Sequence, residues 1–153
     1  MRNLDIRSHF EEYQDIKELS VDDQELYRSA VEARDKAYAP YSEFSVGAAL
    51  RLENGLIVSG NNQENAAYPS GMCAERVAVW SALSQYPDVK IKKLFITARS
   101  EKKEVKRPGS PCGSCSQTLA ESETRQKQPM EVYCTGETGI SLKATSVRDL
   151  LPF

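Results

Sequence analysis

The sequence lacks long apolar runs and any segment typical of a signal peptide. A membrane-spanning helix needs about 18 consecutive apolar residues, and Val46–Leu50, among the longest apolar runs, is short and contains a glycine. The first residues carry acidic side chains and form no apolar core. We therefore expect a cytoplasmic protein that does not enter a membrane.

The sequence also lacks an excess of charge of one sign. It has 20 Lys and Arg against 22 Asp and Glu, for a net charge of -2. Binding to nucleic acid through its phosphates needs a basic surface that releases counterions. The basic stretches near Lys90–Lys93 and Lys102–Arg107 are broken by Glu101 and Glu104. We interpret them as solvated surface and expect no nucleic-acid partner.

What the sequence does contain is enough apolar material for one domain. The chain has 153 residues, of which 40% are hydrophobic and 27% charged, which excludes wholesale disorder. Residues 1–20 are polar and mixed in charge, and we expect them to form an N-terminal extension. Residues 21–153 are expected to form a single domain.

Helical and strand patterns alternate along that domain. The expected elements are helices over 22–38, 73–86 and 112–123 and strands over 46–52, 56–59, 93–98, 130–135 and 140–144, with a last turn over 147–151. Strands that alternate with helices after an initial hairpin indicate an α/β fold. We predict a three-layer α/β/α domain with a mixed central sheet of about five strands.

Cysteines stand at two of the expected helix starts. The segments are Cys73-Ala74-Glu75 and Pro111-Cys112-Gly113-Ser114-Cys115. Helix N-termini lower the pKa of a cysteine, and metals bind the thiolate. Three protein ligands leave a tetrahedral zinc ion one open position, which is typical of a catalytic site. Cys134 lies in an apolar strand and His9, the only histidine, lies in the polar extension, so neither is expected to bind the metal.

This spacing matches a known zinc-deaminase pattern. In that pattern an HxE or CxE segment is followed by PCxxC, and the glutamate acts as general acid and base without binding the metal. Around it, the motifs Tyr38–Leu50, Asn62–Pro69, Cys73–Arg76, Pro111–Cys115 and Leu150–Phe153 resemble the homotetrameric cytidine deaminase family. The resemblance covers residues 22–153.

The resemblance implies a zinc-dependent aminohydrolase. Cys73, Cys112 and Cys115 would hold one Zn²⁺ per chain, and Glu75 would carry protons between water and substrate. The reaction would convert free cytidine or deoxycytidine to uridine or deoxyuridine plus ammonia, as in pyrimidine salvage. From its position alone, Glu75 could also be a capping acid at the third position of a helix.

The resemblance also implies the residues that surround the substrate. Asn62 and Glu64 match the positions that bind the ribose, Phe44 an aromatic beside the nucleoside, and the backbone of Ala74 the position that contacts the base. For Phe44 a place in the core is the alternative, and for Asn62 and Glu64 stabilisation of a loop. Three further positions complete the set: Arg76 beside the thiolates, and Tyr68 and Phe153 near the substrate or a neighbouring subunit of a homotetramer.

The sequence departs from the family in three places, namely Ser116, the spacing of Pro152 and Phe153, and the N-terminal extension, which the shortest members lack. Ser116 stands where an arginine usually follows the last cysteine. If the thiolates lack charge compensation as a result, an arginine at this position is tolerated, and if Ser116 fills a crowded pocket, the same change destabilises the fold. The alternatives to a cytidine deaminase are a deaminase of a modified cytosine nucleoside or nucleoside antibiotic, a zinc-stabilised binding protein without turnover, and a thiol oxidoreductase using Cys112 and Cys115.

Overall fold

The computed structural model describes residues 1–151, and within them it forms one six-stranded sheet and three α-helices. The strands are β1 (Phe10–Tyr13), β2 (Phe44–Leu52), β3 (Ile57–Asn61), β4 (Ile91–Ser100), β5 (Glu131–Thr135) and β6 (Ser141–Ala144). The helices are α1 (Val21–Arg34), α2 (Ala74–Gln85) and α3 (Gly113–Gln126), and single 3₁₀ turns are η1 (Ile16–Glu18), η2 (Tyr68–Ser70) and η3 (Val147–Asp149). None of these helices is long and apolar enough to cross a membrane.

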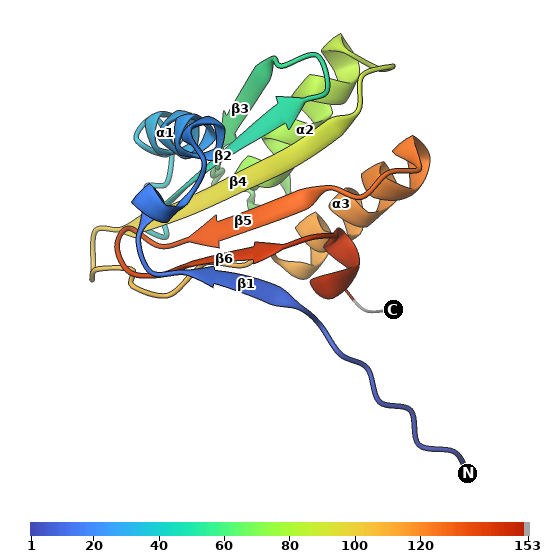
Figure 1. Cartoon of the computed structure of the whole chain (residues 1–153). Helices are drawn as coiled ribbons and strands as arrows, with labels where there is room; N and C mark the ends of the chain where they lie inside the picture. Colours follow the sequence, from blue (N-terminus) through green and yellow to red (C-terminus); the bar gives the residue numbers. More distant parts are fainter. Residues whose placement is uncertain (152–153) are drawn as a thin grey trace.

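The predicted three-layer α/β/α arrangement with a mixed sheet is confirmed. The strand order is β1-β6-β5-β4-β2-β3, in which β4 and β5 are parallel and all other neighbours are antiparallel. Helix α1 covers one face of the sheet, and α2 and α3 lie on the opposite face (Figure 1). Both helices that start with the predicted metal ligands are therefore on the same side of the sheet.

Alternation along the central strands produces the two cores. In β4, Leu94 and Ile96 pack toward α2, whereas Phe95 between them packs toward α1 with Leu26. Successive side chains of a strand point to opposite faces. Because the central strands are covered on both faces, their middle positions are buried without alternation, as in the five residues Leu94–Ala98 of β4.

Helix α1 ends at Arg34, earlier than the position near Tyr38 that the sequence predicted. Ser20 caps the start of the helix, since its hydroxyl accepts a hydrogen bond from the amide of Asp23. Beyond the helix, the amide of Tyr38 donates to the carbonyl of Asn62 at 3.0 Å. The chain before Pro40 therefore pairs with the loop after β3 instead of adding another helical turn.

The sheet has one strand more than the roughly five that the sequence predicted. Strand β1, within the polar N-terminal extension, pairs antiparallel with β6, so that Phe10 lies opposite Ala144. The sequence of this strand has no alternating apolar pattern by which it could be predicted, because three of its four residues are exposed. The edge of β6 offers unpaired backbone groups, and β1 satisfies them.

A row of alternating charges ties β1 to the rest of the sheet. The Lys143 ammonium lies 3.3 Å from a carboxylate oxygen of Glu11 and 3.0 Å from one of Glu131. Lys93 lies 3.6 Å from Glu131 and 2.6 Å from Asp23 of α1. These five residues connect β1, β6, β5, β4 and α1 on the face that α1 covers.

The segment that leads into α3 is fixed across the end of β5. The amide of Glu137 donates to the carbonyl of Val105 at 2.7 Å. A Cβ atom at Gly136 would lie only 2.2 Å from that same carbonyl oxygen, so the close approach requires glycine. This contact holds the long connection after β4 against the end of β5.

Candidate metal centre and adjoining cavity

Three cysteine sulfurs meet where α2 and α3 begin. Cys73 and Cys112 are the N-cap residues of the two helices, and Cys115 lies in the first turn of α3. The Sγ atoms of all three lie within 4.8 Å of one another. Neither N-cap side chain makes a capping hydrogen bond, so both sulfurs are available for other partners.

The sulfur cluster fits a zinc ion. Tetrahedral coordination with Zn–S bonds of about 2.3 Å places sulfurs about 3.8 Å apart, which small side-chain rotations can reach from the observed spacing. Thiolates are also the soft ligands that zinc prefers over calcium or magnesium. Within residues 1–151 the group contains Cys73, Cys112 and Cys115 alone, so Cys134 and His9 stay outside it and one coordination position is left open.

The electrostatics favour a thiolate at Cys73. A hydrogen bond from the Cys115 thiol, helped by one from Arg76, lowers the pKa of Cys73. The same contact with Cys73 raises the pKa of Cys115. In the metal-free chain the cluster therefore keeps part of its protons, and metal binding must release them.

Glu75 is buried beside the sulfurs, with only 6% of its surface exposed. Burial raises the pKa of this carboxyl group, and the neighbouring Cys73 thiolate adds to the effect, against the lowering by the backbone amide of Glu75. Glu75 is the second residue of α2 and not the third, the position that a capping box uses. Its surroundings suit a carboxylate that takes up and releases a proton.

A cavity of about 650 Å³ opens beside Cys73. Its wall contains four of the other predicted site residues, namely Asn62, Glu64, Tyr68 and Arg76. Outside the wall lie Phe44, Ala74, Glu75, Cys112 and Cys115. The full lining is Tyr41, Ser42, Asn62, Gln63, Glu64, Asn65, Ala66, Tyr68, Pro69, Gly71, Met72, Cys73 and Arg76.

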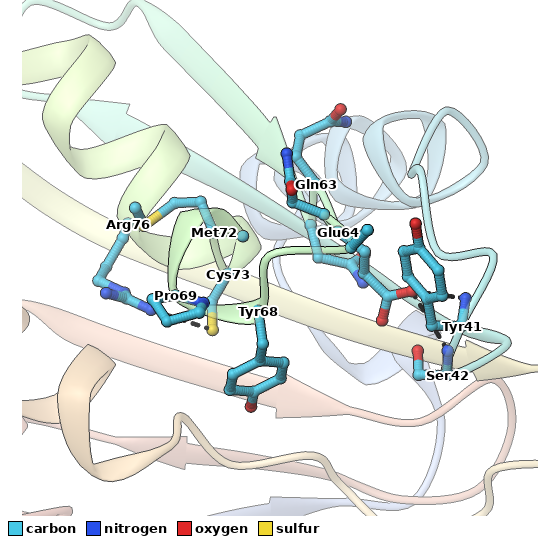
Figure 2. Close-up of a pocket in the computed structure, with 13 residues that line it drawn as sticks. Tyr41, Ser42, Gln63, Glu64, Tyr68, Pro69, Met72, Cys73 and Arg76 are labelled. Carbon is cyan, nitrogen blue, oxygen red and sulfur yellow. Dashed lines mark hydrogen bonds between the residues drawn. The ribbon is translucent and has the colours of Figure 1, made fainter.

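The Glu64 carboxylate is held at one of its oxygens. Figure 2 shows it directed at the turn formed by Tyr41 and Ser42, where Oε2 accepts hydrogen bonds from the two amides at 2.9 and 3.2 Å. Hydrogen bonding from the Ser42 side chain, together with these amides, lowers the pKa of Glu64. Glu64 is therefore an anion at neutral pH with Oε1 free of these contacts. Sequence reasoning missed this turn, because a backbone amide leaves no signal in the residue type.

The Asn62 amide is engaged with β2. Its Oδ1 accepts from the amide of Val46 at 2.8 Å and its Nδ2 donates to the carbonyl of Phe44 at 2.9 Å. These contacts agree with the alternative role that the sequence left open for Asn62, in which its side chain stabilises a loop. Phe44 is the first residue of β2, and 37% of its surface is exposed, so it is not a core residue.

Arg76 and Tyr68 lie on opposite sides of Cys73. Arg76 Nη2 donates to the Cys73 sulfur at 3.5 Å, as Figure 2 shows. Tyr68 in η2 is 91% exposed, and in Figure 2 its ring extends away from the loop. Phe153, the other predicted contact, lies outside the described residues.

Comparison with known proteins gives a consistent result. The family model of the cytidine and deoxycytidylate deaminase zinc-binding region matches residues 20–129. A cytidine deaminase of Sporosarcina psychrophila is 41% identical over 132 residues, which cover 86% of this chain and 90% of that protein. A cytidine deaminase of Halalkalibacterium halodurans is 42% identical over 101 residues, or 66% of this chain and 72% of that protein.

Solved structures agree with the sequence comparison. The crystal structure of cytidine deaminase from Burkholderia pseudomallei has a TM-score of 0.70 and 37% identity, and the match covers 84% of this chain and 95% of that one. For cytidine deaminase from Mycobacterium tuberculosis the TM-score is 0.65 and the identity 30%, over 87% and 96% of the two chains. The family match begins after β1, which places the first strand outside the matched region.

Proposed function

Because this chain belongs to the cytidine and deoxycytidylate deaminase family, we propose that it hydrolyses free cytidine and deoxycytidine to the corresponding uridines and ammonia. The observation that carries this proposal is the meeting of three cysteine sulfurs with the buried Glu75 at the starts of α2 and α3. A purely structural zinc site has no need of that carboxylate, and it usually has four protein ligands.

The protein side of the mechanism depends on Glu75. Cys73, Cys112 and Cys115 would hold a Zn²⁺ ion, which would supply the Lewis acidity that makes water a nucleophile at neutral pH. Glu75 accepts a proton from the attacking water and delivers it to the ring nitrogen next to the amino-bearing carbon. It then takes the second proton from the hydroxyl now on that carbon and passes it to the amino group, which leaves as ammonia while the carbon keeps the oxygen as a carbonyl. The raised pKa of the buried Glu75 suits a group that must hold and release the proton.

Residues in the cavity wall and beside it supply recognition of the nucleoside. In the wall, Glu64 presents Oε1 to a sugar hydroxyl, and Asn62 fixes the loop that carries it. Outside the wall, Phe44 flanks the nucleoside and the backbone of Ala74 contacts the base. Because Glu64 is an anion and already occupies the amides of Tyr41 and Ser42, a substrate phosphate would meet repulsion there.

We further propose that the enzyme acts as a homotetramer. Several large aromatic side chains around the cavity and on α2 are exposed in the single chain, and such patches commonly mark interfaces. They are Tyr38, Tyr41, Tyr68 and Trp80. Sedimentation of the zinc-loaded protein tests the assembly directly.

The test of function is a substrate panel on zinc-loaded protein. Cytidine, deoxycytidine, cytosine, cytidine monophosphate and adenosine are incubated separately, and ammonia release and the ultraviolet change are followed. We expect turnover of both cytosine nucleosides, with kcat/KM for cytidine at least about 100-fold above that for its monophosphate. Absence of ammonia from either nucleoside, with stoichiometric zinc present, would contradict the proposal.

A further inference from the structure

Trp80 lies one helical turn beyond Arg76 on α2. The Arg76 guanidinium carbon is 5.7 Å from the centroid of the indole ring, within the distance at which a cation is attracted to an aromatic face. Residues four apart on a helix lie on the same side. The indole therefore lies against the guanidinium that contacts the Cys73 sulfur.

Arg76 has few other restraints. Its Nη2 donates to Cys73 Sγ at 3.5 Å, and its Nε is buried without a hydrogen-bond partner among the described residues. An arginine side chain has many rotamers, and fixing one of them costs conformational entropy. The Cys73 sulfur, with Cys115 as a further electrostatic partner, lies on one side of this guanidinium and the Trp80 ring on the other, and these contacts define its position.

The position of Arg76 matters for the metal. Three thiolates and one Zn²⁺ carry a net charge of −1, which weakens the attraction that holds the metal site together unless a nearby cation offsets it. A guanidinium that leaves the sulfur for solvent no longer provides that offset, because water screens its charge. Groups that hydrogen-bond to metal ligands commonly change metal affinity by about 10- to 100-fold.

We propose that Trp80 is a positioning residue of the zinc site, whose indole face holds the Arg76 guanidinium against the Cys73 sulfur and so slows metal release. This inference rests on the proposed function of Cys73 as a zinc ligand. Trp80 contacts neither metal nor substrate in this proposal. It acts through Arg76 alone, which sets the form of the test.

The experiment measures zinc release from the full, zinc-loaded chain to a chromogenic chelator. Trp80→Leu keeps apolar bulk but removes the aromatic face, whereas Trp80→Phe keeps an aromatic face. Each substitution is made in the native chain and together with Arg76→Gln. We expect Trp80→Leu to speed release about two- to fivefold, the range of an exposed cation–π contact, and Trp80→Phe to stay closer to the native rate. In the Arg76→Gln background, Trp80→Leu should add nothing.

Phe10→Leu provides the matched control. Phe10 is an aromatic residue with the same 46% exposure as Trp80, but it lies on β1 and away from the metal ligands. Its substitution should leave zinc release unchanged. Sedimentation on the same samples shows whether assembly has changed, and Trp80→Met replaces the leucine variant if that variant does not fold.

Two results would overturn the inference. One is zinc release from Trp80→Leu at the native rate. The other is equal acceleration with and without Arg76, which would show that Trp80 acts through the fold or the assembly. Failure of the native chain to retain zinc at its cysteines would instead contradict the proposed function, so the two failures are distinguishable.

Discussion

Asn62 and Val46 form a closed pair of hydrogen bonds. The backbone amide of Asn62 donates to the Val46 carbonyl at 3.2 Å, and the Val46 amide donates to Asn62 Oδ1 at 2.8 Å. The Asn62 side chain thus acts like one more residue of a β-ladder at the start of β2. The loop that forms the cavity wall and the strand that carries Phe44 are joined by this residue.

Asn62→Ala should therefore affect stability and substrate binding together. The change removes the hydrogen bonds to Val46 and Phe44, and we expect the free energy of unfolding to fall by about 1–3 kcal/mol. We expect KM for cytidine to rise at least about fivefold, because the wall that carries Glu64 loses its attachment. Urea denaturation and steady-state kinetics measure the two effects.

Asn54→Ala is the matched control for that change. Asn54 Oδ1 accepts one exposed hydrogen bond from the Leu56 amide in the turn between β2 and β3. Loss of this hydrogen bond should lower the free energy of unfolding by less than about 1 kcal/mol and leave KM for cytidine unchanged. If Asn62→Ala raised KM no more than this control, the link between the pair and the cavity would be refuted.

Glu75→Gln should abolish most turnover without removing the metal. The substitution keeps shape but cannot accept a proton, and general acid–base catalysis contributes about 100- to 10,000-fold. We expect a loss at the upper end of that range, because one carboxylate serves several proton transfers. Turnover and zinc content are measured on the same preparation.

The control for this prediction is Glu121→Gln, an exposed site on α3, which should behave as the native chain. Turnover of Glu75→Gln within about tenfold of the native rate would exclude Glu75 as the proton carrier. Loss of zinc along with activity would show that the carboxylate supports the structure of the site instead.

Asp23→Asn should make stability less dependent on pH. Burial alone would raise the pKa of Asp23, but hydrogen bonds from Lys93 and Ser20 outweigh it and hold the pKa below its usual value. A carboxyl whose pKa is lower when folded stabilises the protein above its unfolded pKa, near 3.9, and this contribution is lost as pH falls through the folded pKa. The native chain should therefore lose, at acid pH, stability that Asp23→Asn never had.

The measurement is urea denaturation at several pH values between about 7 and about 3. Near neutral pH we expect Asp23→Asn to be less stable by about 1.5–3 kcal/mol, and the difference from the native chain to narrow below about pH 4. Asp22→Asn, at the adjacent exposed position of α1, should show a much smaller difference. If the difference in unfolding free energy between the native chain and Asp23→Asn stayed constant down to the lowest pH, the assigned role of the Asp23 carboxylate would be contradicted.

Ser116→Arg should destabilise the chain. The sequence left open whether an arginine at this position would be tolerated, and the structure shows Ser116 with 4% of its surface exposed, next to Cys115. A guanidinium forced into that space loses its hydration, and we expect a cost of at least about 2 kcal/mol. Thermal unfolding of the zinc-loaded variant checks this.

Gln117→Arg is the control, because Gln117 is exposed on the same helix. This variant should have the melting temperature of the native chain. A Ser116→Arg variant with native melting temperature and full zinc content would support the other interpretation, in which the extra charge compensates the thiolates.

The sequence by itself determined the chemistry of the centre. Cys73 and Glu75 lie within one helical start, and Cys112 and Cys115 within another, so their relative positions follow from local backbone geometry. The alternation of helices and strands after an initial hairpin likewise predicted the layered mixed sheet, because helices that connect strands pack on the faces of the sheet. These features depend on neighbours in the chain, which a sequence displays directly.

Only the tertiary structure decided which distant groups hydrogen-bond to each polar side chain and which strands pair. It gave β1 a place beside β6, directed one oxygen of Glu64 to the amides of Tyr41 and Ser42, and buried Ser116. Backbone amides and strand edges carry no residue-specific signal, and their partners are far away in sequence. Which of them an oxygen or an unpaired strand meets is settled by how distant segments of the chain pack together, and most buried polar groups find a partner in this way.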